Sequence, residues 1–195
     1  MTPITSILLI VDSIQDRDIE FEQAILDAGY LINEVVQADK NFLAQTNQGR
    51  SDLIIASVDK VRIELMEQIA LLIETNPLPI IVFTPDENQQ AINNAIKSGV
   101  SAYIVDGFKA NRIRPIIEIA ISRFTVINQL QSELKQTKQR LDERKIIDKA
   151  KGIIMKEKAI HEDEAYQLIR KMAMNKNSSM AKVSLNIIEI YELMA

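Results

Sequence analysis

Five short apolar runs divide the first 110 residues of this chain of 195. Short continuous apolar runs are typical of strands buried on both faces of a parallel sheet, and the segments between them have helical spacing. Strands that alternate with helices predict an α/β domain, here a doubly wound five-stranded parallel sheet. The expected strands are 7–11, 31–36, 53–56, 80–83 and 102–105, and the expected helices are 19–28, 39–48, 62–75 and 87–98.

Helical spacing then continues from about Lys109 to about Lys158, with no proline after Pro115. Its apolar residues recur at steps of three and four, with a register shift near Ile127, as in the seam of a coiled coil. Residues 113–143 are therefore predicted to be a coiled-coil linker that forms a homodimer. The alternative is a single amphipathic helix packed on its own domain. The seam residues are Ile117, Ala120, Phe124, Ile127, Leu130, Leu134 and Leu141.

The last fifty residues contain three helical segments, which together can bury one small core. The first continues through Lys156, the second spans 162–175, and the third spans 180–193 with Ser179 as its expected N-cap. The predicted domains are thus an α/β unit at 1–112, the linker at 113–143 and a compact helical module at 144–195.

Charge is distributed unevenly along the chain. The net charge is −4 overall, but residues 1–112 carry −8 and residues 144–195 carry +3. A basic C-terminal end behind an acidic body indicates that a polyanion would bind at that end. The alternative is a solvated surface whose asymmetry has no function.

Composition excludes several kinds of chemistry. The chain has no cysteine and only one histidine, His161, which excludes disulfides and thiol catalysis and argues against a metal site. We find no pairing of a nucleophile with a base, so we expect neither an enzyme nor a cofactor. The N-terminus lacks the basic start of a signal peptide, and no apolar run reaches membrane-spanning length, so a soluble cytoplasmic protein is expected.

The stretch from Arg144 to Lys156 separates its side chains by type around one helix. Its isoleucines and Ala150 fall on a broad apolar sector. Within about 60° of one another on a second sector lie Lys145, Lys149, Gly152 and Lys156. Glycine inside a helix costs roughly 1 kcal/mol relative to alanine, and here it would let a phosphate backbone approach the lysines. Lys151 falls instead beside Arg144, where it would contact a different nucleic-acid element or anchor the fold.

Polar residues that follow the five expected strands resemble the active edge of the receiver domain of bacterial response regulators. The corresponding positions here are Asp12, Ser13, Ser57, Thr84 and Asp106. The resemblance places Ser57 where that family has its phosphorylated aspartate, Ser13 in place of an acid that holds Mg²⁺, and Asp106 in place of a lysine. A serine without an activating base is a poor acceptor, and Asp106 would repel a phosphoryl group. We therefore expect a pseudo-receiver with a degenerate phosphorylation site. Asp59 is a less favoured, displaced acceptor.

The helical module resembles the ANTAR domain, the RNA-binding module of bacterial transcription antiterminators. The likeness covers residues 140–190 and includes Ala150-Lys151-Gly152 and Glu164-Ala165-Tyr166. Two further segments, 101–107 and 120–124, are similar to the nitrate-responsive antiterminators, which join a receiver-like domain to ANTAR.

This resemblance implies a regulator that binds paired hairpins in a leader RNA and prevents terminator formation. It also implies a nitrate- or nitrite-sensing partner protein and a role in nitrate assimilation. The residues expected to bind RNA are Arg144, Lys145, Lys149, Lys151, Gly152, Lys156 and Arg170. The arginines would reach loop bases. Tyr166 could be a stacking ring, but its spacing is more often that of a core residue.

Two other functions fit the same organisation. The first is a DNA-binding response regulator with a C-terminal helical domain. The most basic helix, however, is the first of the three, whereas a recognition helix is normally the second of its pair. The second is a pure interaction protein, in which reversing the charge of Lys149 would change nothing in RNA binding.

Overall fold

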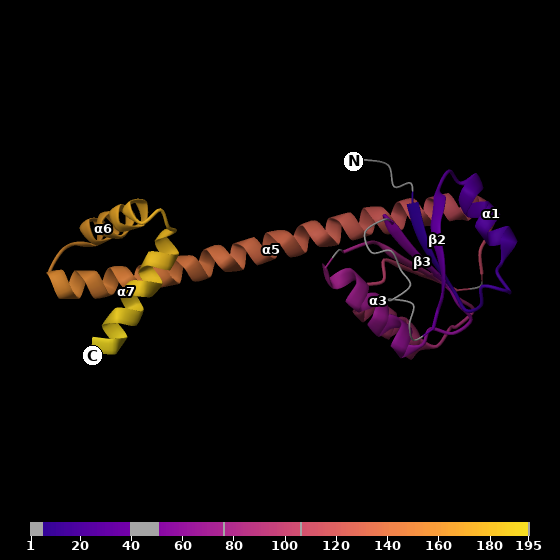
Figure 1. Ribbon diagram of the computed structural model, residues 1–195, viewed down its shortest axis with the longest axis horizontal. Coiled ribbons are helices and arrows are strands. Elements are labelled where there is room, and N and C mark those ends of the chain that lie inside the picture. The colour runs from indigo at the N-terminus through magenta and orange to yellow at the C-terminus, as the bar shows by residue number, and fades with distance from the viewer. Residues whose placement is uncertain (1–5, 40–50, 76, 106, 195) are drawn as a thin grey trace. The chain divides into compact units, whose positions relative to one another are not determined.

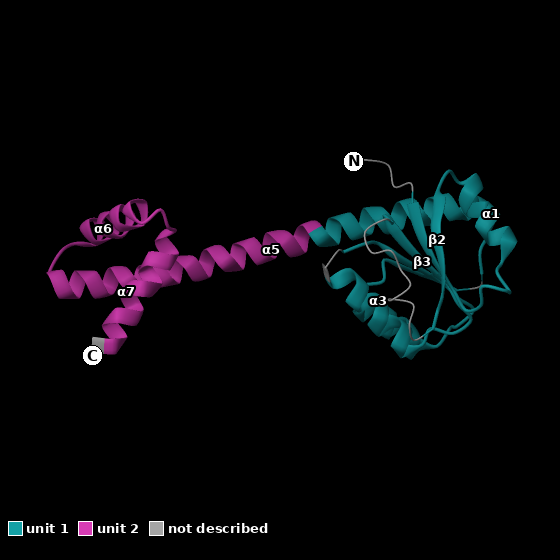
Figure 2. Ribbon diagram, viewed as in Figure 1, with its two compact units in different colours: residues 1–128 teal, residues 129–195 magenta. Residues whose placement is uncertain are grey.

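The structure is a computed structural model that describes residues 6–39, 51–75, 77–105 and 107–194. It divides into two compact units, Met1–Asn128 and Gln129–Ala195 (Figure 2). The boundary between them falls inside the expected linker.

The first unit contains a five-stranded sheet in the order β2-β1-β3-β4-β5, in which every pair of neighbours is parallel (Figure 1). The sheet predicted from the apolar runs is confirmed. The strands are β1 (Ser6–Val11), β2 (Leu31–Gln37), β3 (Leu53–Ser57), β4 (Ile80–Phe83) and β5 (Ala102–Ile104). The helices between them are α1 (Ile19–Asp27), α3 (Ile63–Thr75) and α4 (Gln89–Lys97).

Each face of the sheet carries its own core. Alternate residues of β1 point to opposite faces, so Ile7 joins the cluster under α1, whereas Leu8 joins the cluster under α3 and α4. Burial on both faces explains why the strands read as continuous apolar runs. Gly29 ends α1 with φ of +91°, a conformation that favours glycine. The helix expected at 39–48 lies almost entirely outside the described residues.

One helix, α5 (Ala110–Lys158), spans 49 residues and contributes to both units. Ile117 and Ala120 are fully buried in the core beneath α1, so the first part of the predicted coiled-coil seam packs in its own domain. The prediction was wrong there, because steps of three and four also describe a helix lying on a sheet. The later seam residues are exposed: Leu130, Leu134 and Leu141.

The second unit forms the three-helix module from the end of α5, α6 (Glu162–Asn175) and α7 (Met180–Met194). Ser179 caps α7 as expected, its hydroxyl accepting a hydrogen bond from the Lys182 amide at 3.2 Å. Ala159, after α5, adopts a left-handed φ of +51°, which is costly for a residue other than glycine. The buried core residues are Ala150, Ile154, Ala165, Ile169, Ala173, Val183 and Ile188. Among the described residues, no helix is both long and apolar enough to span a bilayer.

Candidate nucleic-acid interface

At the carboxyl edge of the sheet, the first unit has a cavity of about 320 Å³. The topology brings four of the expected site residues to its wall: Asp12, Ser13, Ser57 and Thr84. Asp106, the fifth, lies outside the described residues.

Three of these side chains, Asp12, Ser13 and Thr84, already have partners within the chain. The Asp12 carboxylate accepts a hydrogen bond from the Asp59 amide at 2.6 Å and lies 3.5 Å from the Arg62 guanidinium. The Thr84 hydroxyl donates to the Asp59 carbonyl at 3.2 Å, and the Ser13 hydroxyl accepts from the Gln15 amide. Asp12 and Thr84 thus hold the loop after β3 in place.

This arrangement does not favour phosphoryl transfer. Ser57 ends β3 without a carboxylate, and Arg62 already lies beside the one acid retained after β1. An acyl phosphate at this site would need both a carboxylate nucleophile and an acidic cage for Mg²⁺. In the part of the chain that the structure describes, no group of three or more potential metal-binding side chains gathers.

In the second unit, the lysine row of α5 consists of Lys145, Lys149 and Lys156, and the last two contact side chains of α7. The Lys149 ammonium donates to the Glu192 carboxylate at 2.7 Å, and that of Lys156 lies 3.5 Å from the Tyr191 hydroxyl. Lys145 lies 3.9 Å from Asp142. Exposed pairs of this kind contribute about 0 to 1 kcal/mol, so a phosphate could replace these partners at little cost.

Gly152 lies exposed within this row, and nothing in the described structure requires it to be glycine. A Cβ added there would meet no atom within 4 Å, and its backbone is ordinary helix. Internal packing therefore does not explain the glycine, which leaves open space beside the lysines.

Lys151 lies on a different side of α5, as the helical geometry predicts. Its ammonium contacts the carboxylates of Asp148 and Glu162 at 2.6 Å each, and only 14% of its side chain is exposed. Its hydrogen bonds to Asp148 and then Glu162 raise its pKa, and the bond from Lys151 chiefly lowers the pKa of Asp148. Of the two roles considered from the sequence, the geometry favours the anchor, because this lysine ties α5 to the start of α6.

Replacing Lys151 with methionine should destabilise the helical module by about 1 kcal/mol, since both carboxylate partners are half exposed. The Asp148 pKa is lower in the folded state, so its contribution is complete above pH of about 4 and is lost as the pH falls through the folded value. The Lys151 pKa is raised in the folded state, so its contribution is complete below pH of about 10 and is lost as the pH rises through the folded value. Urea unfolding at pH 6 and pH 3 should show less acid sensitivity in the variant. The control is Lys171→Met, at an exposed position of α6, which should be as acid-sensitive as wild type. If K151M were also as acid-sensitive as wild type, Lys151 would not anchor α6 to α5.

Arg144 and Tyr166 line a second cavity of about 320 Å³, between α5 and α6. Tyr166 is 41% exposed, so the expectation that its spacing makes it a core residue is wrong. Arg170 is exposed one turn further along α6 and does not line this cavity.

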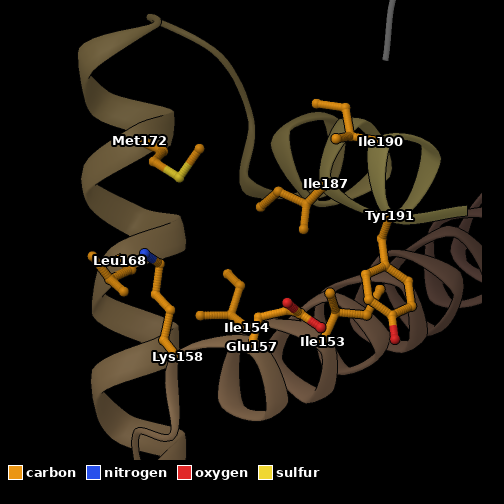
Figure 3. Close-up of a pocket in the computed structure, with 9 residues that line it drawn as sticks. All are labelled: Ile153, Ile154, Glu157, Lys158, Leu168, Met172, Ile187, Ile190 and Tyr191. Carbon is orange, nitrogen blue, oxygen red and sulfur yellow. The ribbon is translucent and has the colours of Figure 1, made fainter. Parts of the chain in front are cut away.

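A cavity of about 550 Å³ opens between the three helices of the module (Figure 3). Isoleucine, leucine and methionine side chains from all three helices point into it, and Tyr191 stands at one side. Glu157 and Lys158 are its only charged lining residues, so it lacks the cations that a polyanion requires.

Four residues that the sequence did not single out complete these surfaces: Arg140, Glu162, Tyr191 and Glu192. Three of them, Glu162, Tyr191 and Glu192, come from α6 or α7 and meet the lysines only through the packing of the module. Arg140 had a readable signal, because it lies one helical turn before Arg144.

Comparisons with known proteins agree with both units. Residues 135–188 match the ANTAR domain family. The transcriptional regulatory protein PdtaR of Mycobacterium tuberculosis is 29% identical over 140 residues, covering 72% of this chain and 68% of that protein. The nitrate regulatory protein of Klebsiella oxytoca is 37% identical over 67 residues, covering 34% of this chain but 17% of that protein.

A solved structure supports the fold of the first unit. The signal receiver domain of a modulated diguanylate cyclase from Desulfovibrio desulfuricans is similar with a TM-score of 0.50 and 19% identity. The match covers 62% of this chain and 96% of that one.

A receiver-like α/β unit is followed in this chain by a basic helical module. The relatives that match the chain are named as regulatory proteins. Residues 135–188 carry an ANTAR domain, and a longer part of the chain is similar to a transcriptional regulatory protein.

Proposed function

We propose that this protein is an RNA-binding regulator of transcription antitermination. It binds hairpins in a leader RNA and prevents the terminator from forming. The observation that carries the proposal is the ANTAR match over a module whose first helix presents Lys145, Lys149 and Lys156 beside an exposed glycine. Cations on one helix face neutralise phosphates, and the glycine admits the backbone between them.

Control is exerted by a partner protein rather than by phosphorylation. The acceptor position is Ser57, and Asp12 is engaged by Arg62 and the loop after β3. The partner is a ligand sensor, of a nitrate or nitrite type given the similarity to the Klebsiella oxytoca nitrate regulatory protein.

Dimerisation uses the exposed part of the predicted linker. Leu130, Leu134 and Leu141 lie along α5 with more than half of each side chain exposed. Covering them in a homodimer would remove apolar surface from water and bring two modules together. Two modules would engage two hairpins, and the second binding step would gain from effective concentration.

Binding to the leader RNA of its own operon tests the proposal. In gel shifts, the full chain should bind the leader hairpins and should bind a hairpin with a scrambled loop far more weakly. Equal affinity for both RNAs would reduce the activity to nonspecific polyanion binding.

Changing Gly152 to alanine should move stability and RNA affinity in opposite directions. The helix should gain about 1 kcal/mol, since the added methyl group meets no protein atom. RNA affinity should fall roughly fivefold, the equivalent of about 1 kcal/mol, as the methyl group obstructs a phosphate. Thermal unfolding and gel shifts measure the two effects. Gln136→Ala, at an exposed position of α5, controls for helix stability alone. If G152A bound RNA with wild-type affinity, the open space at Gly152 would have no role in RNA binding.

The DNA-binding alternative is disfavoured by the charges of α7. In a helix-turn-helix, the second helix of the pair enters the major groove. Here that helix would be α7, whose described residues include one cation, Lys182, against Glu189 and Glu192. Competition between duplex DNA and hairpin RNA for the protein separates the two functions.

A further inference from the structure

The cavity between α5 and α6 combines an aromatic ring with guanidinium groups. Tyr166, in α6, lies next to Ala165, which is buried in the module core, and turns its own ring outward into the cavity. Arg140 and Arg144 line the α5 side, and the half-buried Ile147 adds apolar surface.

These two arginines are available to a ligand. Among the described residues, Arg140 has no ion pair, and the carboxylate of Asp148 lies 3.9 Å from the 82% exposed Arg144. Lys151, in the same cavity, is already held by two carboxylates. A ligand here would therefore meet the unpaired guanidinium group of Arg140, the weakly paired one of Arg144 and an accessible aromatic face.

The chemistry of the cavity favours a base over a bare phosphate. Glu143 and Asp148 also line it, and their carboxylates would repel a phosphate that came alone. The same carboxylates accept hydrogen bonds from the amino and imino groups of a nucleobase edge. Unpaired bases in RNA loops stack on tyrosine rings and arginine planes, whereas bases inside a helix are inaccessible to them.

The cavity and the lysine row lie at two edges of the same exposed face of α5. Helical geometry places Arg140 and Arg144 roughly 130° from the row, and the apolar sector that packs on α6 and α7 lies on the other side. Lys145 and Arg144 are neighbours in the chain, so an RNA hairpin along this face reaches both edges. Its backbone would meet the lysines while a loop base enters the cavity.

We propose that this cavity is a nucleobase pocket that receives one unpaired base of an RNA loop, stacked on Tyr166 and held by Arg140 and Arg144. The proposal rests on the RNA-binding function proposed above. It assigns loop recognition to the arginine side of α5 and leaves the lysine row to contacts that are independent of sequence.

The probe is a hairpin selected by the full-length wild-type chain from a pool with one fixed stem and randomised loops. Replacing Tyr166 with leucine should weaken binding of this hairpin roughly tenfold or more, because a stacking face is lost. Tyr166→Phe keeps the ring and should stay within about threefold of wild type. The stem alone, as a blunt duplex, should bind both variants like wild type.

A second measurement needs no variant and therefore does not depend on folding. Loop uridines replaced one at a time by 5-iodouridine should crosslink on irradiation to Tyr166 of the wild-type chain at one loop position, as read by mass spectrometry of the crosslinked peptide. If the hairpin binds but Y166L stays within twofold of wild type, or if crosslinks bypass Tyr166, the pocket is wrong while the RNA-binding function stands. If no hairpin is selected over the duplex, the proposed function itself fails.

Discussion

A chain in which Lys145 and Lys156 are both changed to glutamate should bind leader RNA about 100-fold more weakly than wild type. These residues mark the two ends of the lysine row, about 16 Å apart along α5, so each would contact a separate phosphate. Neither is ion-paired with Glu192, and Lys145 has only a 3.9 Å pair with the exposed Asp142, whereas Lys149→Glu would replace a 2.7 Å pair with two facing carboxylates. Reversing each charge replaces an attraction with a repulsion.

The salt dependence separates this explanation from a general loss of folding. Loss of two phosphate contacts should make the slope of log affinity against log salt shallower by about 1.4 to 1.8. The matched control is Lys171→Glu with Lys176→Glu, the same change in charge on exposed residues of α6 and its C-cap. If the control lost as much affinity as K145E/K156E, only the net charge would matter, and the lysine row would not be a binding surface.

The second large effect concerns stability. Ile169→Ala should destabilise the helical module by about 2 to 5 kcal/mol, because Ile169 is fully buried where α6 meets the other two helices. A module of this size has only a few kcal/mol of stability to lose. Much of the module should therefore unfold at 25 °C, and RNA binding should fall with it.

Hydrogen exchange measured by mass spectrometry can follow the two units separately. Amides of α6 and α7 should lose protection in I169A, while those of β1 and β3 should keep it, because the sheet has its own cores. Met174→Ala is the control on the same helix, since Met174 is 72% exposed and its removal should cost less than about 0.5 kcal/mol. Equal loss of protection in the sheet would mean that the two units do not unfold independently.

The sequence was sufficient for the order of elements and for many of their bounds. The strand at 80–83 and the helix at 162–175 begin and end where apolar spacing and flanking turn residues indicated. These signals are local, so a single sequence carries them. Gathering the strand-end residues at one edge also needed only the rule that parallel strands end on the same side.

Contacts between helices could not be predicted in the same way. A helical wheel places Lys149 and Lys151 on different sides of α5, but it does not say that Glu192 faces one and Glu162 the other. The spacing of Ile117 and Ala120 fits both a coiled-coil seam and a helix on a sheet. Only the packing in the folded chain shows that these residues lie in the core of the sheet. Tyr166 has the spacing of a core residue, yet the small Ala165 and the larger Ile169 fill the core without it.

In vitro transcription across the leader of its own operon tests the central claim most directly. The template carries the hairpins and the terminator, and the readout is the fraction of transcripts that pass the terminator as protein is added. We predict that readthrough rises with the wild-type chain, that K145E/K156E leaves it at the level without protein, and that acetyl phosphate changes neither result. Unchanged termination at protein concentrations that saturate the hairpins in gel shifts would contradict the account.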